Sequence, residues 1–150
     1  MLAALNTKVV GVIRPVAIVD NASWTCLAID TKGWDYCEIL LLSGATDIAM
    51  TALYLTESDD DSSYSTVANT TFGTSNNDTG SASTLPSATD DNLIHGFAVD
   101  CRARKRYLKV VATGGDGAAG AFLCGVAKLY RGEQGSLTAA QAGFAQRMVV

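Results

Sequence analysis

Short apolar segments separated by turn residues recur along most of the chain, and this pattern limits the fold more than any other feature. Val, Ile, Leu and aromatic residues dominate segments 9–19, 24–29, 34–42, 48–55, 92–100, 106–112 and 119–130. Gly, Asp, Asn or Pro stands at most of the junctions between them, as is typical of strands joined by turns. The chain is therefore predicted to be all-β, an antiparallel β-sandwich of jelly-roll type with extended terminal arms.

Several junctions carry specific turn signals. Residues 30–33 read DTKG, with Asp first and Gly fourth, which predicts a hairpin turn closed by a left-handed glycine. Residues 43–45 read SGA and predict a second turn, while the glycine-rich 113–117 predicts a hairpin tip. Pro15 interrupts the first segment, which favours an edge strand or a bend there.

The strands on both sides of residues 30–33 are apolar on both faces. In 34–42 one face carries Cys37, Ile39 and Leu41, and the other carries Tyr36, Leu40 and Leu42 together with Glu38. In 119–130 one face carries Phe122, Cys124 and Val126, and the other carries Leu123, Ala127 and Leu129. A strand with one face in water should alternate polar and apolar residues. Charged residues make up only 17% of the chain, against roughly 25% in soluble domains. We therefore expect another chain to cover part of this surface, most simply in a homo-oligomer, with a trimer favoured.

Length and composition along the chain predict one domain with a tail. Residues 1–134 are expected to form the sandwich, interrupted by a polar loop at 56–91 that holds short strands near 64–68 and 70–73. In the tail, 135–150, Thr138 and Gln141 have the spacing of a capping box. A short helix and an arm that orders on a partner are both compatible with the tail sequence.

The sequence offers no catalytic set or metal site. His95 lies in the middle of a predicted strand, without a nucleophile motif near it, which favours a structural role. The acidic run 57–61 lacks the glycine and the closing glutamate of a calcium loop. No cysteine pair has zinc-binding spacing. The chain is therefore predicted not to be an enzyme and to need no metal or cofactor.

The cysteines and the N-terminus bear on the compartment. Cys26, Cys37, Cys101 and Cys124 each lie in an apolar run, which predicts reduced, buried thiols in a protein made in a cytoplasm. A cross-strand disulfide between Cys26 and Cys37 is the alternative, because they flank the 30–33 turn at similar distances. The N-terminus does not read as a signal peptide, and no apolar run reaches the ~20 residues that cross a bilayer. We expect no membrane contact.

A basic cluster, RARKR at 102–106, could contact phosphates, an acidic partner or the acidic loop of a neighbouring subunit. The net charge of −4 argues against general affinity for nucleic acid. Stacking aromatics are missing from the cluster apart from Tyr107. The cluster is therefore predicted either to dock to a protein or to be a solvent-exposed start of a strand. We expect no direct contact with nucleic acid.

Two segments resemble motifs of small tailed-bacteriophage structural proteins. The segment 28–36 (AIDTKGWDY), followed by an apolar strand and the SGA of 43–45, is similar to a D-T-x-G-aromatic turn in those proteins. The segment 104–110 (RKRYLKV) resembles their R-Y-L-x-V strand. The resemblance implies a head decoration, or cement, protein: non-enzymatic, often trimeric, and bound to the outer face of an assembled capsid, which it braces against the pressure of the packaged DNA.

The predicted function is that of a virion structural protein on the capsid surface, with the major capsid protein as its partner. Residues predicted to contact that partner lie in the two terminal arms and in the basic cluster: Leu2, Leu5, Arg102, Arg104, Lys105, Leu137, Phe144 and Met148. The alternative is a carbohydrate- or receptor-binding module of a virion. That module would use Trp24, Trp34 or Tyr36 as stacking platforms.

Overall fold

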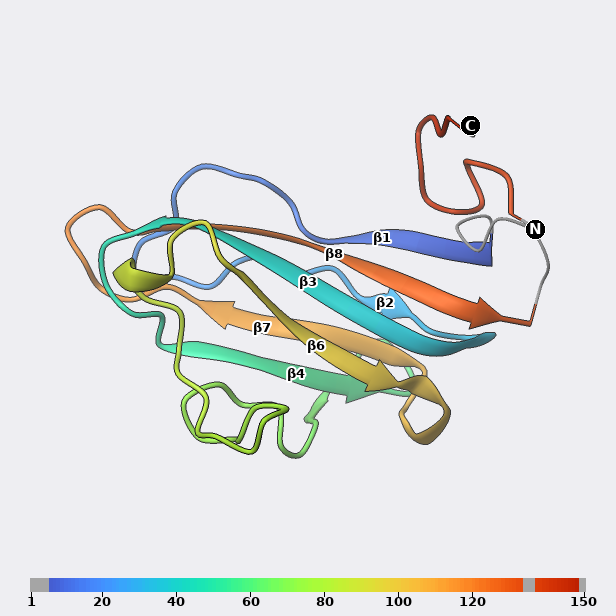
Figure 1. Ribbon diagram of the computed structural model, residues 1–150, viewed down its shortest axis with the longest axis horizontal. Helices are drawn as coiled ribbons and strands as arrows, with labels where there is room; N and C mark the ends of the chain where they lie inside the picture. Colours follow the sequence, from blue (N-terminus) through green and yellow to red (C-terminus); the bar gives the residue numbers. More distant parts are fainter. Residues whose placement is uncertain (1–5, 134–136, 149–150) are drawn as a thin grey trace.

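The computed structural model describes residues 6–133 and 137–148. Nearly all of the regular structure is strand, in two packed antiparallel sheets (Figure 1). The strands are β1 (Thr7–Ile13), β2 (Ile29–Asp30), β3 (Trp34–Thr46), β4 (Ala52–Ser58), β5 (Ser65–Thr66), β6 (Ile94–Asp100), β7 (Tyr107–Thr113) and β8 (Ala121–Gly132), with single 3-10 turns η2 (Ala88–Asp90) and η3 (Cys101–Ala103). The predicted all-β sandwich is confirmed.

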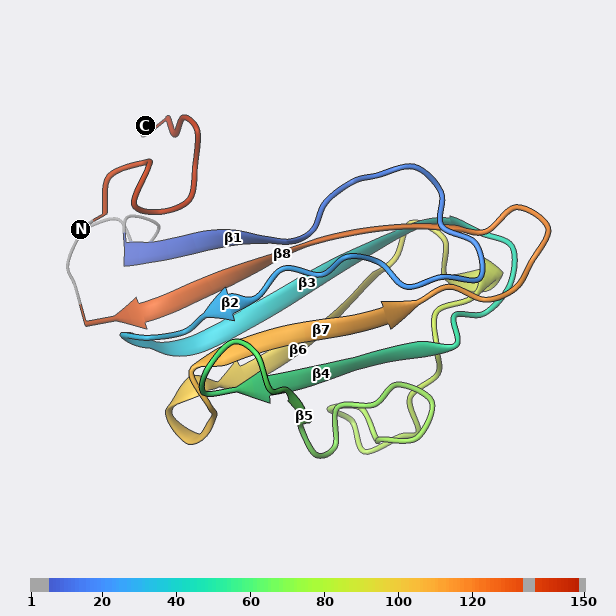
Figure 2. The ribbon, with the colours of Figure 1, turned by 180° about the vertical axis from the view of Figure 1, so that it is seen from behind.

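Each sheet has four strands. One, called here the β8 sheet, has the order β1-β8-β3-β6, and the other, the β7 sheet, has the order β2-β7-β4-β5. Each connection between consecutive strands passes from one sheet to the other, except the connection from β4 to β5 (Figures 1 and 2). Residues far apart in sequence are therefore neighbours in every sheet.

The core lies between the sheets and follows from period-two alternation. On β3 the inward residues Cys37, Ile39 and Leu41 are fully buried, and on β8 the inward residues Ala127 and Leu129 are fully buried as well. The β7 sheet contributes Leu53, Leu55, Leu108 and Val110 from the opposite side. Burial of each large aliphatic side chain contributes about 1.5–3 kcal/mol. The predicted division of faces on β3 and β8 is confirmed.

Both predicted hairpins are wrong, although Gly33 is left-handed as expected. Gly33 has φ of 80°, and the Trp34 N–H donates to the Thr31 carbonyl at 3.0 Å. Yet β2 pairs with β7 while β3 pairs with β8 and β6, so this turn carries the chain across the sandwich. The 113–117 turn likewise joins β7 to β8 across the two sheets. A turn sequence specifies local φ and ψ, not the sheet that the next strand joins.

The predicted turn at 43–45 is also wrong, because these residues continue β3. The register with β8 shifts between Ser43 and Thr46, as in a β-bulge. A Cβ on Gly44 would lie 2.9 Å from the Phe122 Cβ, so the glycine lets β8 come close. In the predicted strand 24–29 only Ile29 is in a strand, and an isolated bridge from Cys26 to Ile13 takes the place of the rest.

The edges and the long loop agree with the sequence in part. β1 ends at Ile13, before Pro15, and is an edge strand as predicted. Strand β5 lies inside the predicted segment 64–68, whereas 70–73 forms turns without a strand. The segment 67–83 folds back beside β4 in both ribbon views, and its Phe72 ring meets Phe97 of β6 edge-on.

The C-terminal tail packs on the edge of β1. The predicted capping box forms: the Thr138 N–H donates to Gln141 Oε1 at 3.0 Å, and the Gln141 N–H donates to Thr138 Oγ1 at 3.3 Å. Within 137–148 it opens a single turn and no α-helix. The Val9 N–H donates to the Ala142 carbonyl at 2.8 Å, and Leu137 and Ala142 are buried. The described part of the tail is therefore a folded cover for a sheet edge.

Candidate functional site

The outer face of the β8 sheet is the most unusual surface of the molecule. Strand register puts Leu40 of β3 beside Val126 of β8, and Leu42 beside Cys124. On the other side of β3, Leu42 lies beside Ile94 of β6. These residues point away from the core, because alternate residues of a strand face opposite sides of the sheet. Large apolar side chains from three adjacent strands thus share one outer face.

Three of these outward residues are exposed, and so is Phe122, which lies on the same face of β8. Together they form what we call the apolar patch: Leu42, Ile94, Phe122 and Val126. Their exposed fractions are 46%, 67%, 42% and 43%. Single exposed apolar residues are common on proteins, but contiguous apolar surface marks an interaction site. The prediction that the second face of β3 and β8 is apolar is therefore confirmed for one half of the sheet.

Further exposed apolar residues lie in loops at the same end of the sandwich. Val16 and Ile18 lie between β1 and β2, Ile48 between β3 and β4, and Leu93 just before β6. Both ribbon views place these loops together at one end, on the left in Figure 1 and on the right in Figure 2. Among the described residues, no exposed large apolar side chain belongs to a strand of the β7 sheet. Apart from Met148 in the tail, the exposed large apolar side chains among the described residues thus lie on one face and at one end of the sandwich.

The opposite end of the same face is aromatic and cationic. Tyr36 and Tyr130 stack with ring centroids 5.5 Å apart. The Arg102 and Arg131 guanidinium carbons lie 4.9 and 5.4 Å from the Tyr36 centroid. Three groups therefore crowd the Tyr36 ring, and Trp24 is only 6% exposed in the core. The stacking platforms of the carbohydrate-binding alternative are mostly occupied.

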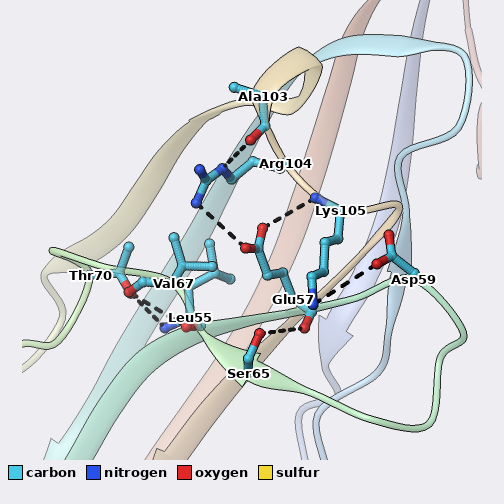
Figure 3. Close-up of polar contacts among 9 residues, drawn as sticks. All are labelled: Leu55, Glu57, Asp59, Ser65, Val67, Thr70, Ala103, Arg104 and Lys105. Atoms are coloured by element: carbon cyan, nitrogen blue, oxygen red, sulfur yellow. Dashed lines mark hydrogen bonds and ion pairs between the residues drawn. The ribbon is translucent and has the colours of Figure 1, made fainter.

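The basic cluster is paired with acidic residues of its own chain. The Arg104 guanidinium lies 3.7 Å from Glu57 Oε1, and the Lys105 ammonium lies 3.9 Å from Asp59 (Figure 3). The Lys105 backbone N–H also donates to Glu57 Oε2 at 3.2 Å. The acidic run that could have met a neighbouring subunit thus meets the cluster within one chain.

The two arginines that flank these residues are paired in the same way. Arg102 binds Asp100 at 2.6 Å, and Arg106 binds Asp30 at 2.7 Å. The hydrogen bond from each arginine holds the pKa of its carboxyl partner below the usual value. These contacts join β2, β4 and the end of β6 to η3 and to the residues between η3 and β7, so the cluster has a structural role of its own.

Glu57→Gln is expected to destabilise the fold by about 1–2 kcal/mol, because the Glu57 side chain is only 15% exposed, forms an ion pair with Arg104 and accepts from the Lys105 backbone N–H. Urea unfolding at low and high salt measures this. Asp59→Asn is the matched control, since its partly solvated pair should contribute about 0–1 kcal/mol. Equal losses for the two variants would contradict the assignment of Glu57 as the organising acid.

His95 of β6 lies beside an aromatic ring. Its ring meets Phe72 edge-on, with centroids 6.1 Å apart, and burial lowers its pKa. Its buried Nδ1 has no hydrogen-bond partner among the described residues. The described residues also contain no cluster of three or more His, Cys, Asp or Glu that could hold a metal ion.

The four cysteines are free, so the Cys26–Cys37 disulfide does not form. Burial raises the pKa of the Cys26 thiol to about 11. The Cys37 thiol instead contacts Cys101, and this hydrogen bond together with burial raises its pKa. Cys124 is half-exposed on the outer face of the β8 sheet, whereas the other three are buried as predicted.

The predicted terminal contact residues have different outcomes. Leu2 and Leu5 lie outside the described residues. Leu137 is buried. Phe144 is half-buried, and the Arg147 guanidinium carbon lies 5.8 Å from its ring centroid. Met148 is 90% exposed. Of the described terminal residues, Met148 is thus the one most open to a partner, and the apolar patch, which the contact prediction did not include, offers more surface.

Within the described residues, no helix has the length and apolar character needed to cross a membrane. No protein-family model, curated protein or solved structure matches this chain. Its function is therefore inferred from its own surface and fold.

Proposed function

We propose that this chain is a non-enzymatic virion structural protein that binds and stabilises an assembled phage capsid, as a decoration protein. The observation that carries the proposal is the apolar patch on one end of the β8 sheet. A patch of large side chains on regular strands is rigid, so docking it costs little conformational entropy. Its burial contributes on the order of 25 cal/mol per Å².

Repetition on a shell would multiply this contact. A capsid presents many identical sites, and a trimer of this chain, which we favour as the oligomer, would present three patches to it. Linked contacts raise overall binding well above the affinity of one contact. The proposed partner is the major capsid protein, and the proposed place of action is the outer surface of the virion.

The strand orders β1-β8-β3-β6 and β2-β7-β4-β5, with repeated crossing between sheets, support the jelly-roll architecture that the sequence predicts. Jelly rolls occur in viral capsid domains and in lectin domains, so the architecture alone fits both candidate functions. The surface separates them. Because Trp24 is buried and the Tyr36 ring is crowded, the decoration function is the better supported.

Co-sedimentation with DNA-free tailed-phage capsids tests the proposal. The wild-type chain is expected to pellet with the shells, and Val126→Lys to lose about 2 kcal/mol or more of binding, because it places a charge in the apolar patch. Val111→Lys is the matched control: Val111 is a half-buried valine of β7, a central strand of the other sheet. It should pellet like the wild type.

Two results would overturn the proposal. One is a wild-type chain that stays in the supernatant at all salt concentrations. The other is equal binding by Val126→Lys and wild type, which would remove the apolar patch from the contact. Retention on a polysaccharide column with no affinity for shells would favour the carbohydrate-binding alternative.

A further inference from the structure

The four sheet edges of this fold are protected unequally. The edge of β1 is covered by the tail through the hydrogen bond from Val9 to Ala142. The edges β2 and β5 are strands of two residues each. Short strands and covering segments are common ways in which proteins protect edges. Strand β6 has seven residues and lies at the remaining edge, beside β3.

Among the described residues, no hydrogen bond joins the outer side of β6 to another segment. The direction of its free groups follows from the ladder. The Val9 N–H points away from β8, and in antiparallel pairs the hydrogen-bonding direction alternates with each residue. Val9 is paired with Lys128, Lys128 with Glu38, and Glu38 with Ala98. Because Val9 points away from β8, the backbone groups of Lys128 point to β3, those of Glu38 point to β8, and those of Ala98 point away from β3. Those of Gly96 point the same way.

A groove runs along this free edge. Its volume is about 970 Å³, and it is lined by the whole of β6 and by the loop segment 67–78. Phe72 of the loop and Phe97 of β6 meet edge-on beside it, with ring centroids 5.5 Å apart. An extended segment added beside β6 would thus have backbone partners on one side and a wall of loop residues on the other.

The charges near the groove favour a basic occupant. Asp100 and Arg104 line it but are paired with Arg102 and Glu57. Glu38 and Asp78 also line it, and no ion pair joins either to a described residue. Ala98 lies between Glu38 and the free edge, so a long side chain on an added strand can pass over it. Strands are about 4.8 Å apart, which puts Glu38 within reach of lysine or arginine.

We propose that β6 is a strand-addition site for an extended, basic segment of another protein, which would pair with the outward backbone groups of Gly96 and Ala98 and place a cationic side chain near Glu38. Backbone hydrogen bonds would give the affinity, and the alternating side chains the specificity. The site depends on the open edge of β6 and shares one residue, Ile94, with the apolar patch.

Amide hydrogen exchange of the full chain tests the proposal without a variant. In the free protein the Gly96 and Ala98 amides should exchange faster than those of Phe97 and Val99, which point to β3. The probe is a capped peptide of alternating valine and lysine, as long as the seven residues of β6. Adding it should slow exchange at Gly96 and Ala98 about tenfold. Protection of these amides already in the free monomer, or no response to the peptide, would overturn the proposal.

Variants separate the backbone contribution from the charge contribution. Ala98→Pro removes an outward N–H and should abolish peptide binding while the β3 ladder persists. Glu38→Gln should weaken binding of the lysine peptide several-fold and leave binding of a serine-for-lysine peptide unchanged. Val126→Lys should bind the peptide like wild type even if it fails to bind shells, so the two proposals fail independently. Protection of β6 that rises with protein concentration alone would show a second copy as the occupant and overturn the assignment to a different chain.

Discussion

Gly96→Val is expected to be among the most damaging single substitutions in the chain, with a loss of about 4 kcal/mol or more in the free energy of unfolding. A Cβ at this position would overlap the carbonyl oxygen of Ile39 and lie 3.5 Å from its carbonyl carbon. Both are backbone atoms of β3, held on both sides by the sheet, and cannot move aside as a flexible side chain can. Strand β6 would have to separate from β3.

Two controls show that position, and not residue type, causes this loss. Ala98→Val changes the next residue of β6 on the same sheet face as Gly96. Gly11→Val changes a glycine of β1 with nothing within 4 Å of its Cβ position. Both should stay within about 1 kcal/mol of wild type, because valine favours strands. Urea unfolding and the soluble yield measure all three variants. A Gly96→Val protein as stable as Gly11→Val would show that β6 does not approach β3 so closely.

The alternation on β3 and β8 was sufficient to predict which residues face the core, because side chains on a strand have a period of two. The sheet to which each strand belongs was not predictable in the same way. Gly33 has the left-handed conformation that the sequence indicates, yet the segment 30–33 crosses the sandwich. Sheet membership depends on pairings such as Ile29 with Leu108, which are remote in sequence.

The candidate site shows the same limit. An apolar second face was predictable from Leu40, Leu42 and Val126, but its confinement to one end was not, since that depends on register between three strands. The contact between Lys105 and Glu57 was likewise not predictable, because Glu57 lies 48 residues earlier in the sequence. The open edge of β6 has no local sequence signal at all. It is recognised only after the cover on β1 and the shortness of β2 and β5 are known.

Gly143→Ala is expected to release the tail from β1. Gly143 has φ of 83°, and a Cβ there would overlap the Val9 carbonyl oxygen and lie 3.0 Å from the Val9 carbonyl carbon. The left-handed conformation alone costs a non-glycine residue about 1–2 kcal/mol. Releasing the tail also exposes Leu137, whose burial contributes about 1.5–3 kcal/mol. The Val9 amide, now bonded to Ala142, should lose its protection from hydrogen exchange.

Gly80→Ala separates the conformational cost from the overlap, because Gly80 has φ of 79° and nothing within 4 Å of its Cβ position. It should cost only about 1–2 kcal/mol and leave the Val9 amide protected. Strand β1 has seven residues, so release of the tail would leave the sheet with a second long open edge in addition to β6. Gly143→Ala should therefore also associate beyond the wild-type oligomer as concentration rises, seen by sedimentation velocity, whereas Gly80→Ala should sediment like the wild type. A Gly143→Ala protein with a protected Val9 amide would show that β1 is covered by something other than the tail.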